Sequence, residues 1–148
     1  MNEKFSRFIK VQEERYPIAL EEIQGGKKIG HWIWYIFPRI QGFERDNMTF
    51  DYAIRDIEEA TDYLNHSVLG TRLIEICSEL LKLDSNDPLS IFESPDHEKL
   101  QASVTLFSQV KDANLVFVAV LEKFFDGKSH IETLDILHKQ RNEKEEAP

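Results

Sequence analysis

LGTRLIEICSELL, residues 69–81, sets the structural class of the protein. One stripe of its apolar side chains recurs at three- and four-residue intervals and consists of Leu69, Leu73, Ile76, Cys77, Leu80 and Leu81. Side chains at this spacing lie on one face of a helix, so the stretch predicts a helix that buries this face in a core. In that stripe Cys77 is a small apolar core residue rather than a nucleophile.

Helical patterns continue on both sides of this stretch. The apolar residues of 5–23 predict a helix that kinks or breaks at Pro17, because proline removes an amide donor. Capping residues predict further helix starts at Asp56 with Glu59, Asp87 before Pro88, Ser94 before Pro95, Asp112 with Asn114, and Ser129 with Glu132. Strand character is confined to residues 32–37 and 49–54.

These patterns predict a mainly α protein, a single compact domain of five to seven helices with room for one short β-hairpin. The length of 148 residues fits one domain, and no repeat or low-complexity linker divides it. We expect the helical domain to span residues 1–140 and the charged residues 141–148 to form a flexible tail.

Composition excludes several classes of function. The formal net charge of −9, from 27 acidic and 18 basic residues, repels a phosphate backbone, so we expect no nucleic acid partner. No apolar run is long enough to cross a bilayer and the single cysteine, Cys77, forms no disulfide, which predicts a cytoplasmic protein without a membrane partner. The five histidines lack metal-ligand spacing and no cofactor motif is present, so we expect neither a metal nor a cofactor.

Both tryptophans of the chain lie in HWIWYIFPR, residues 31–39. Aromatic faces stack on bases and arginine binds phosphate or carboxylate through paired hydrogen bonds, so Trp32, Trp34 and Arg39 are candidate ligand-binding residues. His31, whose ordinary pKa lies near neutrality, is a candidate general acid or base. The alternative is that the aromatic rings only fill the core.

A second polar concentration follows Ser94-Pro95. The exposed amides of a helix start can hold an anion, so Lys99, Ser103 and Thr105 are further candidate ligand-binding residues, and Asp96 is a second candidate catalytic residue. We expect this helix start to meet the tryptophan segment in one pocket with stacking faces, a cationic rim and backbone donors.

The chain resembles the domain of unknown function 1810 family, small bacterial proteins that sometimes carry a calpastatin label. The resemblance covers nearly the whole chain and rests on residues 31–38 (HWIWYIFP), 52–54 (YAI), 59–64 (EATDYL), 68–73 (VLGTRL) and 94–107 (SPDHEKLQASVTLF). The chain departs from the usual pattern at Arg39, Ser67 and Val104, where the family commonly has Gln, Pro and Met. The resemblance implies a fold and a cytosolic location rather than a mechanism.

A weaker resemblance is to helical N-glycosidases associated with NAD and ADP-ribose. It rests on residues 34–38, on Leu69 with Leu73, and on Ser94-Pro95. The catalytic glutamate region of that group has no clear counterpart here.

The sequence leaves three hypotheses open. In the first, the chain binds or processes a small anionic aromatic ligand, such as a nucleotide or an ADP-ribose derivative, in a concave pocket. In the second, it is a non-catalytic protein-interaction module with a flat apolar patch. In the third, a homodimer interface covers the aromatic segment and leaves no ligand site there. Whether the chain is an enzyme stays open in all three.

Overall fold

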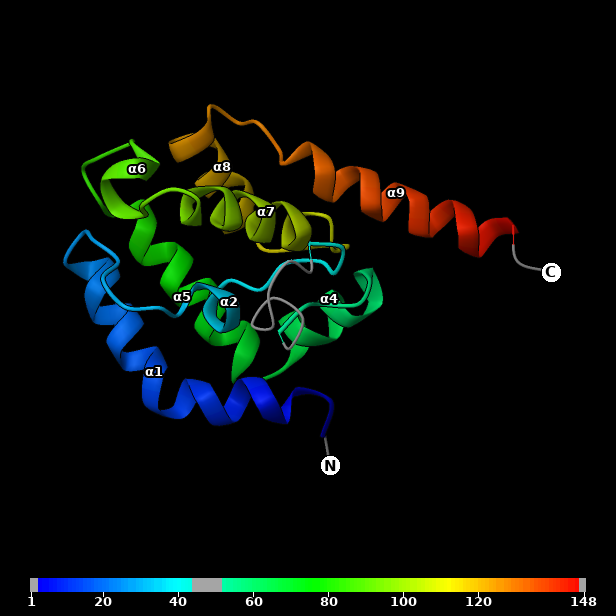
Figure 1. The fold of residues 1–148 in the computed structure, drawn as a ribbon, viewed down its shortest axis with the longest axis horizontal. Coiled ribbons are helices and arrows are strands. Elements are labelled where there is room, and N and C mark those ends of the chain that lie inside the picture. Colours follow the sequence, from blue (N-terminus) through cyan, green and yellow to red (C-terminus); the bar gives the residue numbers. More distant parts are fainter. Residues whose placement is uncertain (1–2, 44–51, 147–148) are drawn as a thin grey trace.

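Helix α5 (Leu69–Leu81) lies in the middle of the protein, as its apolar stripe predicts (Figure 1). The computed structural model describes residues 3–43 and 52–146. Besides α5, these residues form a 3-10 turn η1 (Glu3–Phe5) and the helices α1 (Ser6–Gln24), α2 (Ile33–Ile36), α4 (Ile57–Asn65), α6 (Pro88–Ile91), α7 (Asp96–Ser108), α8 (Val116–Phe125) and α9 (Ile131–Glu146).

The core forms around α5, which packs against α1, α4 and α8. Gly70 allows the close approach of α4 and α5, since a Cβ atom at this position would lie 1.9 Å from the Leu64 carbonyl oxygen. Cys77 is a free thiol that is fully buried in this core, and its burial raises the pKa of the thiol well above the ordinary value. A second layer, formed by α7 against α8 and α9, covers the other side of the core.

The mainly α fold is confirmed. The eight α-helices of the described residues slightly exceed the expected five to seven, because α2 and α6 are short helices of 4 residues each. α1 is one helix with Pro17 inside it, and Figure 1 shows that it bends along its length, so the predicted interruption is a kink rather than a break.

The expected strands are not found among the described residues. Residues 32–37 form the helical turn of α2, in which the N–H of Phe37 bonds to the carbonyl of Ile33 at 2.9 Å. Tertiary packing overrides the strand propensity of these aromatic and branched residues. Of the second predicted strand, 49–51 lie outside the described residues, and Ile54 forms a single parallel bridge with Ile40, which is not a hairpin.

Two of the predicted helix caps are confirmed. Each capping side chain accepts a backbone N–H of the first turn, Asp56 from Glu59 at 2.8 Å and Asp87 from Leu89 at 3.0 Å. At α8 the N-cap residue is Leu115, which makes no side-chain cap, and Asn114 accepts the N–H of Val116 at 2.9 Å from one residue earlier. Each of these bonds satisfies an amide that a helix start would otherwise leave unpaired.

Two predicted caps are wrong. Ser94 does not cap α7, because the helix begins at Asp96 and Pro95 occupies the cap position without a side-chain bond. At the start of α9 the acceptor is not Ser129 but the ring of His130, whose Nδ1 accepts the N–H of Thr133 at 3.3 Å.

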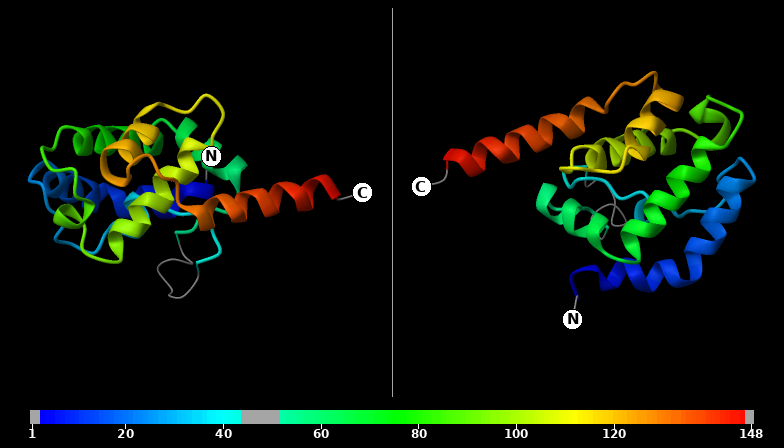
Figure 2. Two further views of the ribbon diagram at one scale, coloured as in Figure 1. Left: turned by 90° about the horizontal axis from the view of Figure 1, so that it is seen from above. Right: turned by 180° about the vertical axis from the view of Figure 1, so that it is seen from behind.

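α9 leaves the body of the protein and projects beyond α4 (Figures 1 and 2). It continues to Glu146, so residues 141–146, expected in a flexible tail, are helical. Two contacts hold it near α4: the side chain of Gln140 donates to the Arg55 carbonyl at 3.0 Å, and Lys144 forms an ion pair with Glu58.

Candidate functional site

The carboxylate of Glu22 fixes the loop that leads into α2. Its Oε1 accepts the backbone N–H groups of Ile29 and Gly30 at 2.8 and 2.9 Å, and Nε1–H of Trp32 at 2.8 Å. Burial acts to raise the pKa of Glu22, but the three hydrogen bonds and the charge of Lys28 outweigh it, so the pKa lies below the usual glutamate value. The ionised carboxylate therefore holds the start of the tryptophan segment in place.

The two tryptophans of this segment occupy different environments. Trp32 is 2% exposed and packs against Phe37 and Phe92 in the core. Trp34 is half-buried, and its ring faces α7. In a strand, residues two apart share a face, whereas around a helical turn they point to nearly opposite sides. The helical turn therefore sends one indole into the core and the other toward a polar region.

A row of alternating rings and charges joins this segment to the start of α7. Nζ of Lys28 lies 5.2 Å from the centre of the Trp32 ring and 2.8 Å from the carboxylate of Asp96. The same carboxylate lies 3.5 Å from Nζ of Lys99, which is 4.9 Å from the centre of the Trp34 ring. Attraction between cation and ring, and between cation and carboxylate, thus fixes Lys99 against Trp34.

The backbone next to Arg39 is fixed by two hydrogen bonds with Ile54. The carbonyl of Arg39 accepts the N–H of Ile54 at 2.8 Å, and the N–H of Gln41 donates to the carbonyl of Ile54, also at 2.8 Å. This short bridge places residue 39 beside Ala53, and the guanidinium lies 4.8 Å from the centre of the Phe43 ring.

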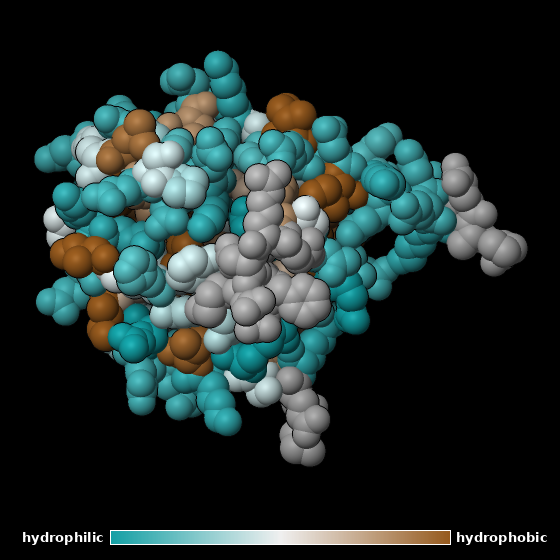
Figure 3. All heavy atoms as spheres, viewed as in Figure 1, coloured by the Kyte–Doolittle hydropathy of each residue, from teal (hydrophilic) through white to brown (hydrophobic). Residues whose placement is uncertain are grey.

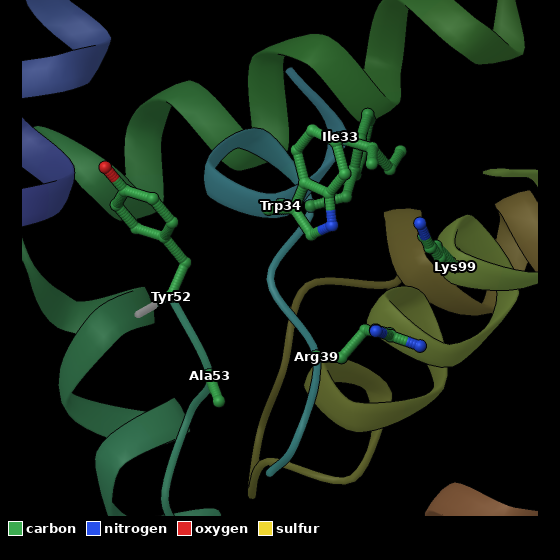
Figure 4. Close-up of a pocket in the computed structure, with 7 residues that line it drawn as sticks. Ile33, Trp34, Arg39, Tyr52, Ala53 and Lys99 are labelled. Carbon is green, nitrogen blue, oxygen red and sulfur yellow. The ribbon is translucent and has the colours of Figure 1, made fainter. Parts of the chain in front are cut away.

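A small cavity lies where these parts meet (Figure 4). Its volume is about 10 Å³, enough for one water-sized group, and it is lined by Ile33, Trp34, Phe37, Arg39, Tyr52, Ala53 and Lys99. Nε1 of Trp34 is buried and has no hydrogen-bond partner among the described residues. In Figure 4 the indole nitrogen faces the side on which Lys99 and Arg39 lie, with Ala53 across the cavity.

A larger cleft begins at the same two cations. It has a volume of about 630 Å³ and lies between the segment 39–43, the first turns of α7 and the first turns of α9. Arg39 and Lys99 line both the cavity and the cleft, so the two spaces adjoin. The cleft, unlike the cavity, is also lined by three acidic side chains, which are Glu98, Glu132 and Asp135.

His130 sits in the wall of this cleft in a fixed orientation. Its backbone N–H donates to Oγ1 of Thr105 at 2.9 Å, and its Nδ1 lies 2.8 Å from Oγ1 of Thr133. The ring packs edge-on against Phe43 with centroids 5.6 Å apart. Burial lowers the pKa of His130, and Arg39 adds to this effect, while nearby carboxylates act against it. The lowered pKa favours the neutral form of the imidazole.

The structure brings only some of the sequence-predicted site residues together. Trp34, Arg39 and Lys99 meet at the cavity, and Asp96 is held between two ammonium groups just behind it. His31 is exposed and lines neither the cavity nor the cleft.

Three other predicted ligand-binding residues are in the interior. Trp32 is 2% exposed, and Ser103 and Thr105 are both 0% exposed. Thr105 nevertheless serves the cleft indirectly, because its hydroxyl accepts the backbone N–H of His130.

Sequence reasoning missed Phe43 and His130 as cleft residues. No local spacing connects either of them to Arg39 or Lys99, since α9 reaches the cleft only by packing on α7. The one available signal was the place of His130 directly before a helix, where a side-chain acceptor is expected.

Two kinds of feature are absent from residues 3–43 and 52–146. None of their helices is both long and apolar enough to cross a membrane. No three of their His, Cys, Asp or Glu side chains gather in a way that could hold a metal ion.

The fold and the cleft together define a small helical protein in which two cationic side chains, Lys99 and Arg39, stand where a cavity joins a larger cleft. The chain belongs to the family described as protein of unknown function (DUF1810), whose model matches residues 2–137, and the first resemblance is thereby confirmed. It is similar to the conserved hypothetical protein Rv1873 from Mycobacterium tuberculosis, known from a crystal structure at 1.38 Å. The two chains share 37% identity with a TM-score of 0.87, over 89% of this chain and 94% of the other.

A comparison with curated proteins finds no match. The resemblance to N-glycosidases receives no support from the family or from the solved structure, and it stays a prediction.

Proposed function

We propose that the chain binds a small anionic ligand of the nucleotide or ADP-ribose type in the cavity beside Trp34 and in the adjoining cleft between the segment 39–43, α7 and α9. The observation that carries the proposal is the indole N–H of Trp34, which is buried beside two cations and has no hydrogen-bond partner within residues 3–43 and 52–146. A buried donor without a partner costs roughly 1–3 kcal/mol, and a ligand oxygen in the cavity would recover this cost. The cavity has room for such an atom but not for a whole anionic group, which would occupy its mouth between Lys99 and Arg39.

The positive charges of the site favour an anionic ligand over a neutral one. Lys99 has a side chain only 16% exposed, so its charge is less screened by water than that of a surface lysine. Asp96 offsets part of the positive charge, but Lys28 shares that carboxylate. The guanidinium of Arg39 adds a second positive charge beside that of Lys99 where the cavity joins the cleft.

The cleft offers space and an aromatic wall for the rest of the ligand. A volume of about 630 Å³ falls in the usual range of small-molecule sites. The rings of Phe43 and His130 line it, and aromatic faces of this kind stack on planar heterocycles.

Other features fit this proposal better than they fit an interaction module. On the face shown in Figure 3 the apolar side chains form small separate groups between hydrophilic ones, rather than one continuous patch. The single cysteine is a buried thiol, which supports placing the function in a reducing cytoplasm.

The experiment is a thermal-shift screen of the protein with AMP, ADP-ribose, NAD and inorganic phosphate, followed by calorimetric titration. A ligand at 100 times its Kd adds about 2.7 kcal/mol to the free energy of unfolding, which is easily measured as a shift in Tm. We expect at least one of the organic anions to bind more tightly than phosphate, because only they fill the cleft.

Two substitutions localise the binding. Trp34→Phe keeps an aromatic ring but removes the N–H, and Lys99→Met keeps the stem but removes the charge. Each should weaken binding about tenfold or more, since a hydrogen bond to a charged group contributes roughly 1.5–3 kcal/mol. Lys10→Met, on the exposed side of α1, is the matched control and should leave the Kd unchanged. Absence of binding by all four compounds, or binding insensitive to both substitutions, would refute the proposal.

A further inference from the structure

The cleft is electrically asymmetric. Arg39 and Lys99 stand where it joins the small cavity, whereas Glu98, Glu132 and Asp135 line only the larger space. All three carboxylates belong to exposed residues. An anionic group is therefore favoured beside Arg39 and Lys99, where the cleft joins the cavity, and repelled next to the three carboxylates.

His130 adds a neutral donor to the acidic part. Because its Nδ1 accepts the backbone N–H of Thr133, the proton of the neutral ring is on Nε2. The backbone N–H bonds to Thr105 and Nδ1 lies beside the Thr133 hydroxyl, so the orientation of the ring is fixed and Nε2–H is the remaining donor of a side chain that lines the cleft.

Carboxylate acceptors beside an N–H donor match the hydrogen-bonding capacity of hydroxyl groups. A hydroxyl both donates and accepts, so it can satisfy a carboxylate of Glu132 and Nε2–H of His130 at the same time. A phosphate, which only accepts, would leave the carboxylates unsatisfied and would be repelled by them.

We propose, on the basis of the proposed function, that the ligand is a sugar or nucleoside monophosphate. Its single phosphate binds at Trp34, Lys99 and Arg39, and its hydroxyl groups face His130 and the carboxylates. The acidic part of the cleft selects against a second phosphate, and this narrows the nucleotide and ADP-ribose class to ligands with one phosphate.

The test is a set of calorimetric titrations at one ionic strength with ribose 5-phosphate, AMP, ADP and adenosine. We expect ribose 5-phosphate and AMP to bind, adenosine to bind at least tenfold more weakly than AMP, and ADP to bind about fivefold or more weakly than AMP. The expected ratio of the Kd of ADP to that of AMP follows from repulsion between the second phosphate and the three carboxylates across several ångströms of water.

A charge-neutralising double variant, Glu132→Gln with Asp135→Asn, probes the selection directly. It should bring the Kd of ADP to within about twofold of that of AMP while the Kd of AMP changes less than threefold. Glu13→Gln, an exposed carboxylate on α1, is the matched control and should leave the ratio unchanged. The Tm of each variant is measured alongside, so that a folding defect is recognised.

The outcomes separate the two proposals. If ADP binds as tightly as AMP in the native protein, or if the double variant leaves the ratio unchanged, the monophosphate inference is overturned while anion binding at Trp34 stands. If no phosphate compound binds, or binding does not depend on Trp34 and Lys99, both fail together.

Discussion

Replacing each tryptophan in turn by phenylalanine compares two indoles that are only two residues apart. Trp32→Phe removes the donor of the 2.8 Å hydrogen bond to the Glu22 carboxylate, a contribution of roughly 1.5–3 kcal/mol. The smaller ring also leaves a void beside Phe37 and Phe92, which costs about 1–2 kcal/mol more. We therefore expect Trp32→Phe to lower the free energy of unfolding by about 3–5 kcal/mol.

Trp34→Phe should behave differently. It removes a buried donor without a partner among the described residues, so roughly 1–3 kcal/mol of desolvation cost is relieved and offsets the lost packing. The net change should be below about 1 kcal/mol, or less than about 4 °C in Tm for a domain of this size.

Urea unfolding at pH 7, followed by far-ultraviolet circular dichroism, measures both variants without depending on indole fluorescence. Equal destabilisation by the two substitutions would refute the reasoning, because it would mean that the N–H of Trp34 is bonded in the native protein. Trp32→Phe also leaves Trp34 as the single indole, so its fluorescence in this variant should report ligand titration.

Three further predictions concern stability and reactivity. The stabilising contribution of the ionised Glu22 is present above its unfolded pKa and is lost as pH falls through its lowered folded pKa. Between about pH 5 and pH 3, where glutamates titrate, the free energy of unfolding of Glu22→Gln should therefore fall less than that of the native protein. Equal losses in the two proteins, measured by urea unfolding, would contradict this. Gly70→Ala should lower the free energy of unfolding by about 3 kcal/mol or more, because its Cβ would overlap the Leu64 carbonyl. A Tm within about 2 °C of the native value, or about 1 kcal/mol, would instead show that α4 and α5 separate easily. Cys77 should react with a thiol reagent only in denaturant, since burial raises its pKa, and rapid labelling of the native protein would show that the core opens.

Much of the helical architecture could be predicted because its causes are local. The stripe of 69–81 gave α5, and the side chains of Asp56 and Asp87 cap helices within two or three residues of themselves. Such interactions involve residues that are close in the chain, so the spacing of residue types is enough to predict them. The kink of α1 follows in the same way from the missing amide of Pro17.

The same local rules failed where two conformations compete. Residues 32–37 have strand-forming side chains, yet Glu22 and the packing of Trp32 against Phe92 favour a helical turn. Ser94 is a good capping residue, but α7 begins only after Pro95, and the serine has no part in it.

The sequence alone determined that this chain is a mainly helical domain with an aromatic and cationic segment at 31–39, because periodicity, capping and composition are properties of the chain itself. Only the tertiary structure decided which side chains make the site. In the folded chain Trp32 points into the core and Trp34 toward Lys99. Ser103 is buried, and His130 lies in the same cleft as Arg39. The physical reason is that a site depends on the packing of distant helices, and the distance between α2, α7 and α9 is set by the shared core rather than by any pattern within one of them.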